Sequence, residues 1–133
     1  MKSFLSVLFF FSAVAAAPAQ VGLSSKLIEL QSEFPGGELS KTEEGYNCYS
    51  VRSPKLESAL VFVFDENMNC FMCAVMPDSK KIYNNWKKLL KKSWKKTGDH
   101  SWSFMKPDGL VMSCDDVAEK DVGRILLFYY KSD

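Results

Sequence analysis

Lysine is the reactive side chain that this sequence gathers most densely. Eight lysines fall within the seventeen residues from 80 to 96, KKIYNNWKKLLKKSWKK, and no acid interrupts them. An ammonium group is a compact point charge, and it lacks the planar fork with which arginine reads base edges. The chemistry available to this stretch is therefore the binding of an anionic macromolecule through its charge, without recognition of a base sequence.

A helix accounts for the spacing of these lysines. When residues 80 to 97 are wound at about 100° per residue, the apolar side chains gather in one arc and the lysines fill the remainder. Asp78 or Ser79 is placed to cap the helix, and Gly98 to end it. The apolar arc, with Trp86 and Trp94, predicts a helix docked on a sheet. The residues that we expect to bind an anion or partner are Lys87, Lys88, Lys91, Lys92, Lys95 and Lys96.

The charge of this helix allows three interpretations. In the first, acids near the C-terminus neutralise the lysines within the fold; these acids are Asp115, Asp116, Glu119 and Asp121. In the second, the lysines bind nucleic acid or an acidic protein surface. In the third, the tryptophan and leucine face enters an anionic membrane, which competes with the core position of Trp86 and Trp94.

Catalytic chemistry has little support in the sequence. His100 is the single histidine, and Asp99, Ser101 and Ser103 are its polar neighbours. No strained nucleophile elbow or glycine-rich oxyanion motif accompanies them, so we expect a loop histidine and a protein that is not an enzyme. A glutamate and His100 acting with Arg52 or Arg124 is a formal alternative for RNA cleavage. No P-loop, GxGxxG or metal-ligand cluster is present, so no cofactor or metal is expected.

The beginning of the chain predicts a secretory signal. Met1 and Lys2 precede an apolar run from Phe4 to Val14, and small residues follow it. We expect residues 1–17 to be the signal peptide, with cleavage within 15–19, and residues 18–133 to be a single secreted α+β domain. The apolar run is shorter than the roughly 17 to 25 residues of a membrane span, so no stable membrane insertion is expected. The predicted location is extracellular, with uptake into a host cell left open.

Four cysteines follow the signal: Cys48, Cys70, Cys73 and Cys114. An even number in an oxidising compartment predicts two disulfides. Cys70-x-x-Cys73 also permits a redox pair or half of a zinc site, but its place in a predicted strand and the lack of a second such pair disfavour both. Successive positions of a strand face opposite ways, so we expect Cys70 and Cys73 each to pair with Cys48 or Cys114, in either combination.

Hydrophobic patterns predict the elements that position these residues. A short helix is expected over residues 23–34, a loop over 38–45, and an acidic loop or helical turn over 115–121. Strands are expected over 46–52, 58–64, 70–76, 101–105, 110–114 and 124–131. The hairpin of 58–64 and 70–76 is apolar on both faces, which predicts a central position in the sheet.

This grouping of strands around a helix predicts the α+β class. We expect a mainly antiparallel sheet of about six strands, packed against one long amphipathic helix and a short N-terminal helix, and stabilised by disulfides.

Tyr46-Asn47-Cys48 resembles the aromatic-x-Cys motif of small secreted effectors from powdery mildew fungi. A signal ending in Ala-Pro-Ala-Gln and a hairpin before a helix that is followed by further strands are also similar to that group. The resemblance implies a ribonuclease-like α+β fold without catalytic residues, in a fungal virulence protein that acts on its host through its surface.

The residues and the resemblance together predict a small secreted, non-enzymatic, effector-like protein. It is expected to bind a host protein or an anionic macromolecule, RNA included, through its surface, with the lysine-rich helix as one contact. The alternatives are a secreted RNA-binding or ribonuclease-like module and a membrane-active protein. The sequence leaves the target and the oligomeric state open.

Overall fold

The computed structural model describes residues 22–117 and 123–130 of the chain. The predicted signal peptide and its cleavage site lie outside these ranges, as do Glu119 and Asp121. In chain order the elements are α2 (Leu27–Glu33), β1 (Glu38–Lys41), β2 (Asn47–Ser53), β3 (Ser58–Phe64), β4 (Cys70–Pro77), α3 (Lys80–Ser93), β5 (Lys95–Gly98), β6 (Ser101–Met105), β7 (Val111–Asp116) and β8 (Leu126–Tyr130).

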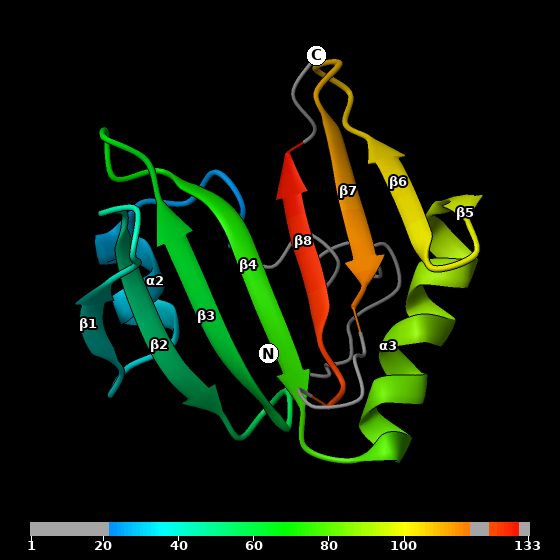
Figure 1. Ribbon diagram of the computed structural model, residues 1–133, viewed down its shortest axis with the longest axis horizontal. Coiled ribbons are helices and arrows are strands. Elements are labelled where there is room, and N and C mark those ends of the chain that lie inside the picture. Colours follow the sequence, from blue (N-terminus) through cyan, green and yellow to red (C-terminus); the bar gives the residue numbers. More distant parts are fainter. Residues whose placement is uncertain (1–21, 118–122, 131–133) are drawn as a thin grey trace.

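The strands form one antiparallel sheet, in the order β1-β2-β3-β4-β8-β7-β6-β5 (Figure 1). The hairpin of β3 and β4 lies in its interior, as its apolar pattern predicts, and five of the seven β3 residues and four of the eight β4 residues are buried. α3 follows β4 and returns the chain to the far edge, where β5, β6 and β7 complete the sheet before β8 inserts between β4 and β7.

The prediction of about six strands was wrong, because the sheet has eight within the described ranges. β1 comes from the segment expected to be a loop. All four of its residues are exposed, so no alternation of apolar and polar residues marks it as a strand. Its stability comes from the ladder that it forms with β2, where Glu38 lies opposite Ser50 and Lys41 opposite Asn47. This edge strand therefore forms because its backbone pairs with β2, and a hydrophobic pattern contains no information about such pairing.

The prediction of one long helix over residues 80–97 was also wrong. α3 ends at Ser93, and both helices are short, with 14 residues in α3 and 7 in α2. Trp94 takes an extended backbone conformation, with φ −113° and ψ 156°. Its indole is buried between Phe104 and Phe128, at centroid distances of 5.7 Å to each ring. The chain turns at this anchored residue, and the next four residues pair with β6 as β5.

The prediction of stabilising disulfides was wrong as well, since Cys48, Cys70, Cys73 and Cys114 are all buried thiols. Cys73 and Cys114 each lie in register with Phe128, on either side of β8. Two strands separated by a third are roughly 10 Å apart, beyond the Cα separation of about 7 Å that a disulfide tolerates. Cys48 and Tyr49 are successive residues of β2, so their side chains point to opposite faces of the sheet. Because Tyr49 lies in the same cross-strand row as Cys73 and Cys114, Cys48 faces away from both.

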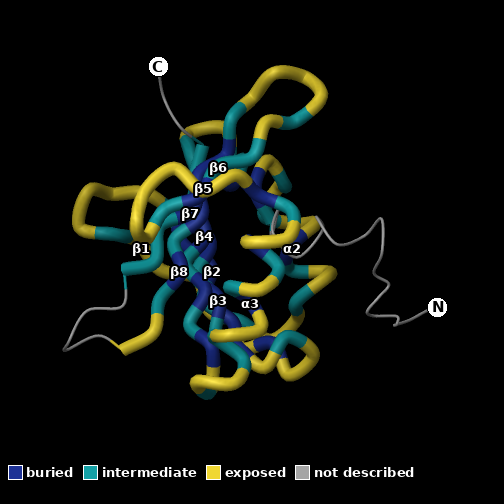
Figure 2. The backbone as a smooth tube through the Cα atoms, turned by 90° about the vertical axis from the view of Figure 1, so that its right-hand side faces the viewer, coloured by how far each residue is buried: buried dark blue, intermediate teal, exposed yellow. Residues whose placement is uncertain are grey.

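The core lies between the sheet and both helices. Residues paired directly across an antiparallel sheet point to the same face, and one such row crosses from β2 to β6: Tyr49, Phe62, Cys73, Phe128, Cys114 and Trp102. α2 packs Leu30 on this face, and α3 packs Trp86 and Leu90 on it. Figure 2 shows both helices on the same side of the sheet. Both described helices therefore lie on one face of the sheet, which we call the covered face, and we call the other face, which carries no described helix, the open face.

Candidate anion-binding surface

The start of α3 is fixed by one of the two caps that the sequence offers. Ser79 accepts a hydrogen bond from the backbone N–H of Ile82 on its side-chain oxygen, at 3.2 Å. This satisfies an N–H that has no partner within the helix. Asp78 instead forms an ion pair with Arg52 of β2. That ion pair holds the pKa of Asp78 below its ordinary value, first through the hydrogen bond from Arg52.

The orientation of α3 is set by tryptophans on its inner face. Trp86 is 4% exposed and Trp94, at the C-cap, is 6% exposed, which confirms their predicted core positions. The indole of Trp86 lies 5.9 Å from the ring of Phe128, and its N–H donates to Ser58, at 3.4 Å. Leu90, which lies between the two tryptophans in the sequence, is fully buried. With this face held against the sheet, the opposite face of α3 must point outward.

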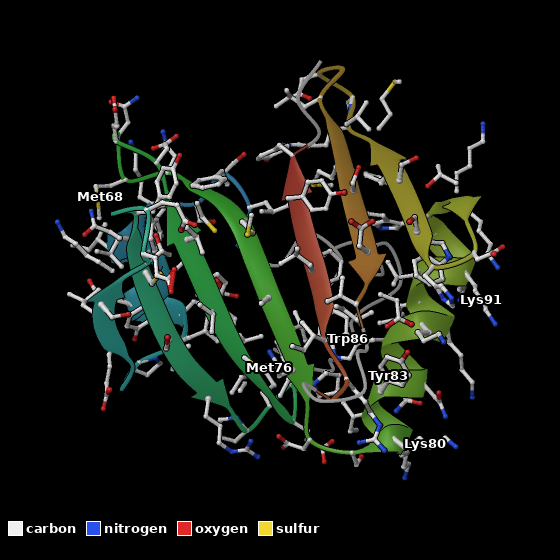
Figure 3. All side chains as sticks on the ribbon, viewed as in Figure 1. Met68, Met76, Lys80, Tyr83, Trp86 and Lys91 are labelled. Carbon is white, nitrogen blue, oxygen red and sulfur yellow. The ribbon has the colours of Figure 1, made fainter. Side chains whose placement is uncertain are left out.

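Five lysines occupy the outward face of α3, and we call them the lysine surface: Lys80, Lys81, Lys88, Lys91 and Lys92. All five are exposed. In Figure 3, Lys80 and Lys91 project away from the sheet near the two ends of α3, whereas Trp86 points toward it. Among the described residues, no carboxylate lies within 4.0 Å of the ammonium group of any of the five.

The other predicted binding lysines lie elsewhere. Lys95 and Lys96 are exposed on β5, and their side chains point to opposite faces of the sheet, because they are successive residues of a strand. Lys96 shares the covered face with Trp102, whereas Lys95 lies opposite Ser103 on the open face. The structure thus brings together Lys88, Lys91 and Lys92 of the predicted set and separates them from Lys95 and Lys96.

Among the described residues, Lys87 is the one predicted lysine that an acid of the fold neutralises. Its ammonium nitrogen lies 3.5 Å from a carboxylate oxygen of Asp116, whose side chain is 4% exposed. The hydroxyl of Tyr83 donates to the same carboxylate, and the Lys87 ammonium lies 4.8 Å from the Tyr83 ring centroid. The pKa of Tyr83 is raised to about 12, first by burial and then by the hydrogen bond and charge of Asp116. This cluster fastens α3 to β7.

The first interpretation, in which acids of the fold neutralise the lysines, holds for Asp116 but not for Asp115. Asp115 accepts a hydrogen bond from the Tyr129 hydroxyl at 2.8 Å and faces the open side of the sheet, so it does not neutralise the helix. Arg124 adds a positive charge close enough to Tyr83 to lower its pKa slightly against the larger raising effects. Sequence reasoning did not group Arg124 with the lysines, because 32 positions separate it from Lys92 and only the fold brings it back to α3.

We expect the Asp116→Asn variant to lose about 1 to 3 kcal/mol of unfolding free energy, because the half-buried Lys87 loses its counter-charge and the Tyr83 hydroxyl loses a charged acceptor. The Tyr83 pKa should also fall toward its ordinary value of about 10, because the carboxylate no longer opposes its ionisation. Urea unfolding and ultraviolet titration of tyrosine measure the two effects. Asp115→Asn is the matched control, and both variants are made in a Tyr129→Phe background because the pKa of Tyr129 is raised by burial and then by its hydrogen bond to Asp115. In that background Asp115→Asn should leave the tyrosine titration unchanged. An equal response in both variants would contradict the cluster.

The other sequence candidates do not assemble into a reactive site in the part of the chain that the structure describes. His100 is exposed in the turn between β5 and β6, where its carbonyl accepts the Asp116 N–H at 2.8 Å. Its ring has no hydrogen bond to an acid or hydroxyl within these ranges. No group of three or more histidine, cysteine, aspartate or glutamate residues is placed there to hold a metal ion.

Two open pockets of the described chain lie away from the lysine surface. One, of about 330 Å³, adjoins Ser24 and Tyr130, and the other, of about 320 Å³, adjoins Arg52 and Met76. No residue of α3 lines either pocket. The lysine surface is therefore separate from both of these pockets.

Comparison with protein-family models, with curated proteins and with solved structures found no match for this chain. Within residues 22–117 and 123–130, no helix is both long enough and apolar enough to cross a membrane.

Proposed function

We propose that this protein is a small secreted binding protein, rather than an enzyme, and that its lysine surface binds an anionic macromolecule of a host or of the environment. The observation that carries this proposal is the exposure of Lys80, Lys81, Lys88, Lys91 and Lys92 together, with no described carboxylate within 4.0 Å of them. An acid of the fold neutralises Lys87. Within the described ranges, no other lysine of α3 forms an ion pair with a carboxylate.

The energetics of α3 support a binding role. Lys88 and Lys92 are four residues apart on one helix, and such a like-charged pair costs roughly 0.2 to 0.5 kcal/mol. An anion placed between the ammonium groups removes this repulsion and adds attraction. Because Trp86 and Leu90 fix the helix in the core, binding does not have to order its backbone.

The surroundings of the lysines favour contact with phosphate or carboxylate groups over contact with bases. Trp86 and Trp94 are buried against the sheet, and Tyr83 is tied to Asp116. No aromatic ring of α3 is therefore presented beside the lysine surface for a base to stack on. Binding of RNA would then be independent of sequence and strongly weakened by salt. The same burial argues against the membrane interpretation, because the apolar face cannot enter lipid while it forms the core.

The secreted and effector-like parts of the proposal are supported by the sequence. The expected signal at residues 1–17 and the resemblance of Tyr46-Asn47-Cys48 to the powdery mildew motif are the evidence. In the structure the Tyr46 ring packs edge-on against Phe71, at 5.2 Å, and the Cys48 thiol is buried. These contacts hold the β1–β2 turn against β4. The motif therefore has a structural role, and we propose the lysine surface as the part of the protein that contacts a partner.

The proposal is tested by measuring the affinity of the protein for a short double-stranded RNA and for polyglutamate across a salt series. If RNA is bound, log K should fall linearly with log salt between about 50 and 200 mM. Changing Lys88, Lys91 and Lys92 to glutamine should weaken binding and reduce that slope by about 2, because up to three counterions are no longer released. A gel of the RNA after incubation separates binding from cleavage.

The matched control changes three lysines outside α3, Lys26, Lys41 and Lys106, to glutamine. It alters the net charge equally, so a specific lysine surface predicts near-unchanged affinity and slope. Equal losses in the two triple variants would show attraction by net charge alone. Failure of the unaltered protein to bind either polyanion at low salt would refute the proposal.

A further inference from the structure

The lysine surface is divided into two rows along α3. At about 100° per residue, Lys80 and Lys91 lie within about 20° of each other around the helix axis and form the first row. Lys81, Lys88 and Lys92 span about 40° and form the second row. The centres of the two rows are about 90° apart. The positive charge of α3 therefore lies on two sides of its outward face rather than along a single line.

The arc between the two rows is the crest of α3, the part of the helix that lies farthest from the sheet. Trp86 and Leu90, which are buried against the sheet, point roughly the opposite way. Asn84 is the residue of α3 that falls in this arc, and it is exposed. The outward face is thus a narrow crest with a small neutral side chain on top and ammonium groups on both sides.

A large ligand has open access to the crest. In Figure 1, α3 lies at one side of the molecule and α2 at the other, so the second helix does not stand beside it. In Figure 3, Lys80 and Lys91 of the first row project away from the sheet. The lysines of the second row are exposed as well. A rigid ligand can therefore contact both rows at once.

The distance between the rows selects among polyanions by shape. An extended lysine places its ammonium nitrogen roughly 8 to 9 Å from the helix axis, so rows about 90° apart are about 12 Å from each other. A single strand has one charged backbone, whereas a duplex groove has phosphates on both walls. The major groove of B-form DNA is about 12 Å wide and about 8.5 Å deep, and it admits an α-helix. The major groove of A-form RNA is deep and too narrow for this.

We propose that the ligand of the lysine surface is a B-form DNA duplex, with α3 in its major groove. The first row contacts the phosphates of one strand and the second row those of the other. This inference rests on the proposed anion-binding function and specifies the polyanion. Asn84 faces the base edges, and a single amide there gives little preference among sequences, so recognition depends on groove shape and charge.

The test compares the affinity for a short DNA duplex, the RNA duplex of the same sequence and the DNA single strand, by fluorescence anisotropy at one salt concentration. The DNA duplex should bind about tenfold more tightly than either of the others, because it alone contacts both rows. Bulky substituents at C5 of its pyrimidines project into the major groove and should weaken binding about tenfold. A ligand that saturates the A·T minor groove should leave the affinity nearly unchanged.

Variants of each row test whether both strands are contacted. Lys80→Gln with Lys91→Gln removes the first row, and Lys81→Gln with Lys88→Gln removes most of the second. Each pair should reduce the slope of log K against log salt for the DNA duplex by about 2, because two counterions are no longer released. Each pair should also lower the preference for DNA over RNA, because binding through a single row does not require a wide groove.

Lys95→Gln with Lys96→Gln is the matched control. These two lysines follow α3 directly but lie on β5 and point to opposite faces of the sheet, so the slope and the preference should stay nearly unchanged. Equal affinity for the DNA and RNA duplexes, indifference to the filled major groove, or an effect of one row alone would overturn this inference and leave anion binding standing. Failure to bind every polyanion at low salt would refute the proposed function itself.

Discussion

Alkaline solution is expected to unfold this protein steeply, with the free energy of unfolding falling by about 4 kcal/mol per pH unit between about pH 9 and pH 11. The cause is the burial of Cys70, Cys73 and Cys114. Burial raises the pKa of all three thiols, to about 12 for Cys70 and well above the ordinary value for Cys73. An unfolded cysteine loses its proton near pH 8.5. Above that pH the folded state holds more protons than the unfolded state, so stability falls as pH rises.

Urea unfolding at several pH values between 7 and 11 measures this slope. Each buried thiol contributes at most about 1.4 kcal/mol per pH unit, so Cys73→Ala and Cys114→Ala should each flatten the curve by about that amount. The double variant should flatten it by about twice as much. A thiol reagent added to the denatured protein, without reductant, should titrate four cysteines. A slope that does not change in the variants would contradict the burial of these thiols as the cause.

The buried face of α3 could be predicted because its information is local. Trp86, Leu90 and Trp94 recur at the period of a helix, and that period alone places them on one side. The central hairpin was predictable for the same reason, since β3 is apolar on both faces. In both cases the residues that make the pattern are close in sequence, and no knowledge of the neighbouring strands is needed.

The edge strands were not predictable, because they bury almost nothing. β1 and β5 exist through their pairing with β2 and β6, and a pattern of burial does not record a backbone ladder. The continuation of the helix through Lys95 was a reasonable extrapolation of the lysine spacing. It failed because Trp94 takes an extended backbone, with its indole against Phe104 and Phe128, and Lys95 then pairs with Ser103 of β6.

The positions of the cysteines and the acids relative to their partners depend on the order and register of the strands, which short stretches of sequence do not reveal. Cys73 and Cys114 share a face, as a disulfide requires, but β8 lies between their strands and places Phe128 between them. Likewise Asp115 and Asp116 are adjacent in the sequence, but their side chains lie on opposite faces of the sheet. Only the register of β7 shows that Asp116 faces α3 and that Asp115 faces the open side.

Phe128→Ala is expected to reduce the free energy of unfolding by about 3 to 5 kcal/mol, a large part of the stability of a domain of this size. Phe128 is fully buried at the centre of the covered face, and its ring contacts both Trp86 and Trp94. Removing the ring leaves a cavity under α3 that the two indoles cannot both fill. Urea unfolding followed by tryptophan fluorescence measures the loss, and the same cavity should shift the emission of the native state.

Leu127→Ala is the matched control, because Leu127 is the adjacent residue of β8 but points to the open face and is only half-buried. It removes a comparable apolar side chain from the same strand and should cost about 1 kcal/mol. The ratio of the two losses measures how unequally the faces of the sheet are packed. Equal losses would mean that α3 does not cover Phe128, and the lysine surface would then lose the anchor that turns it outward.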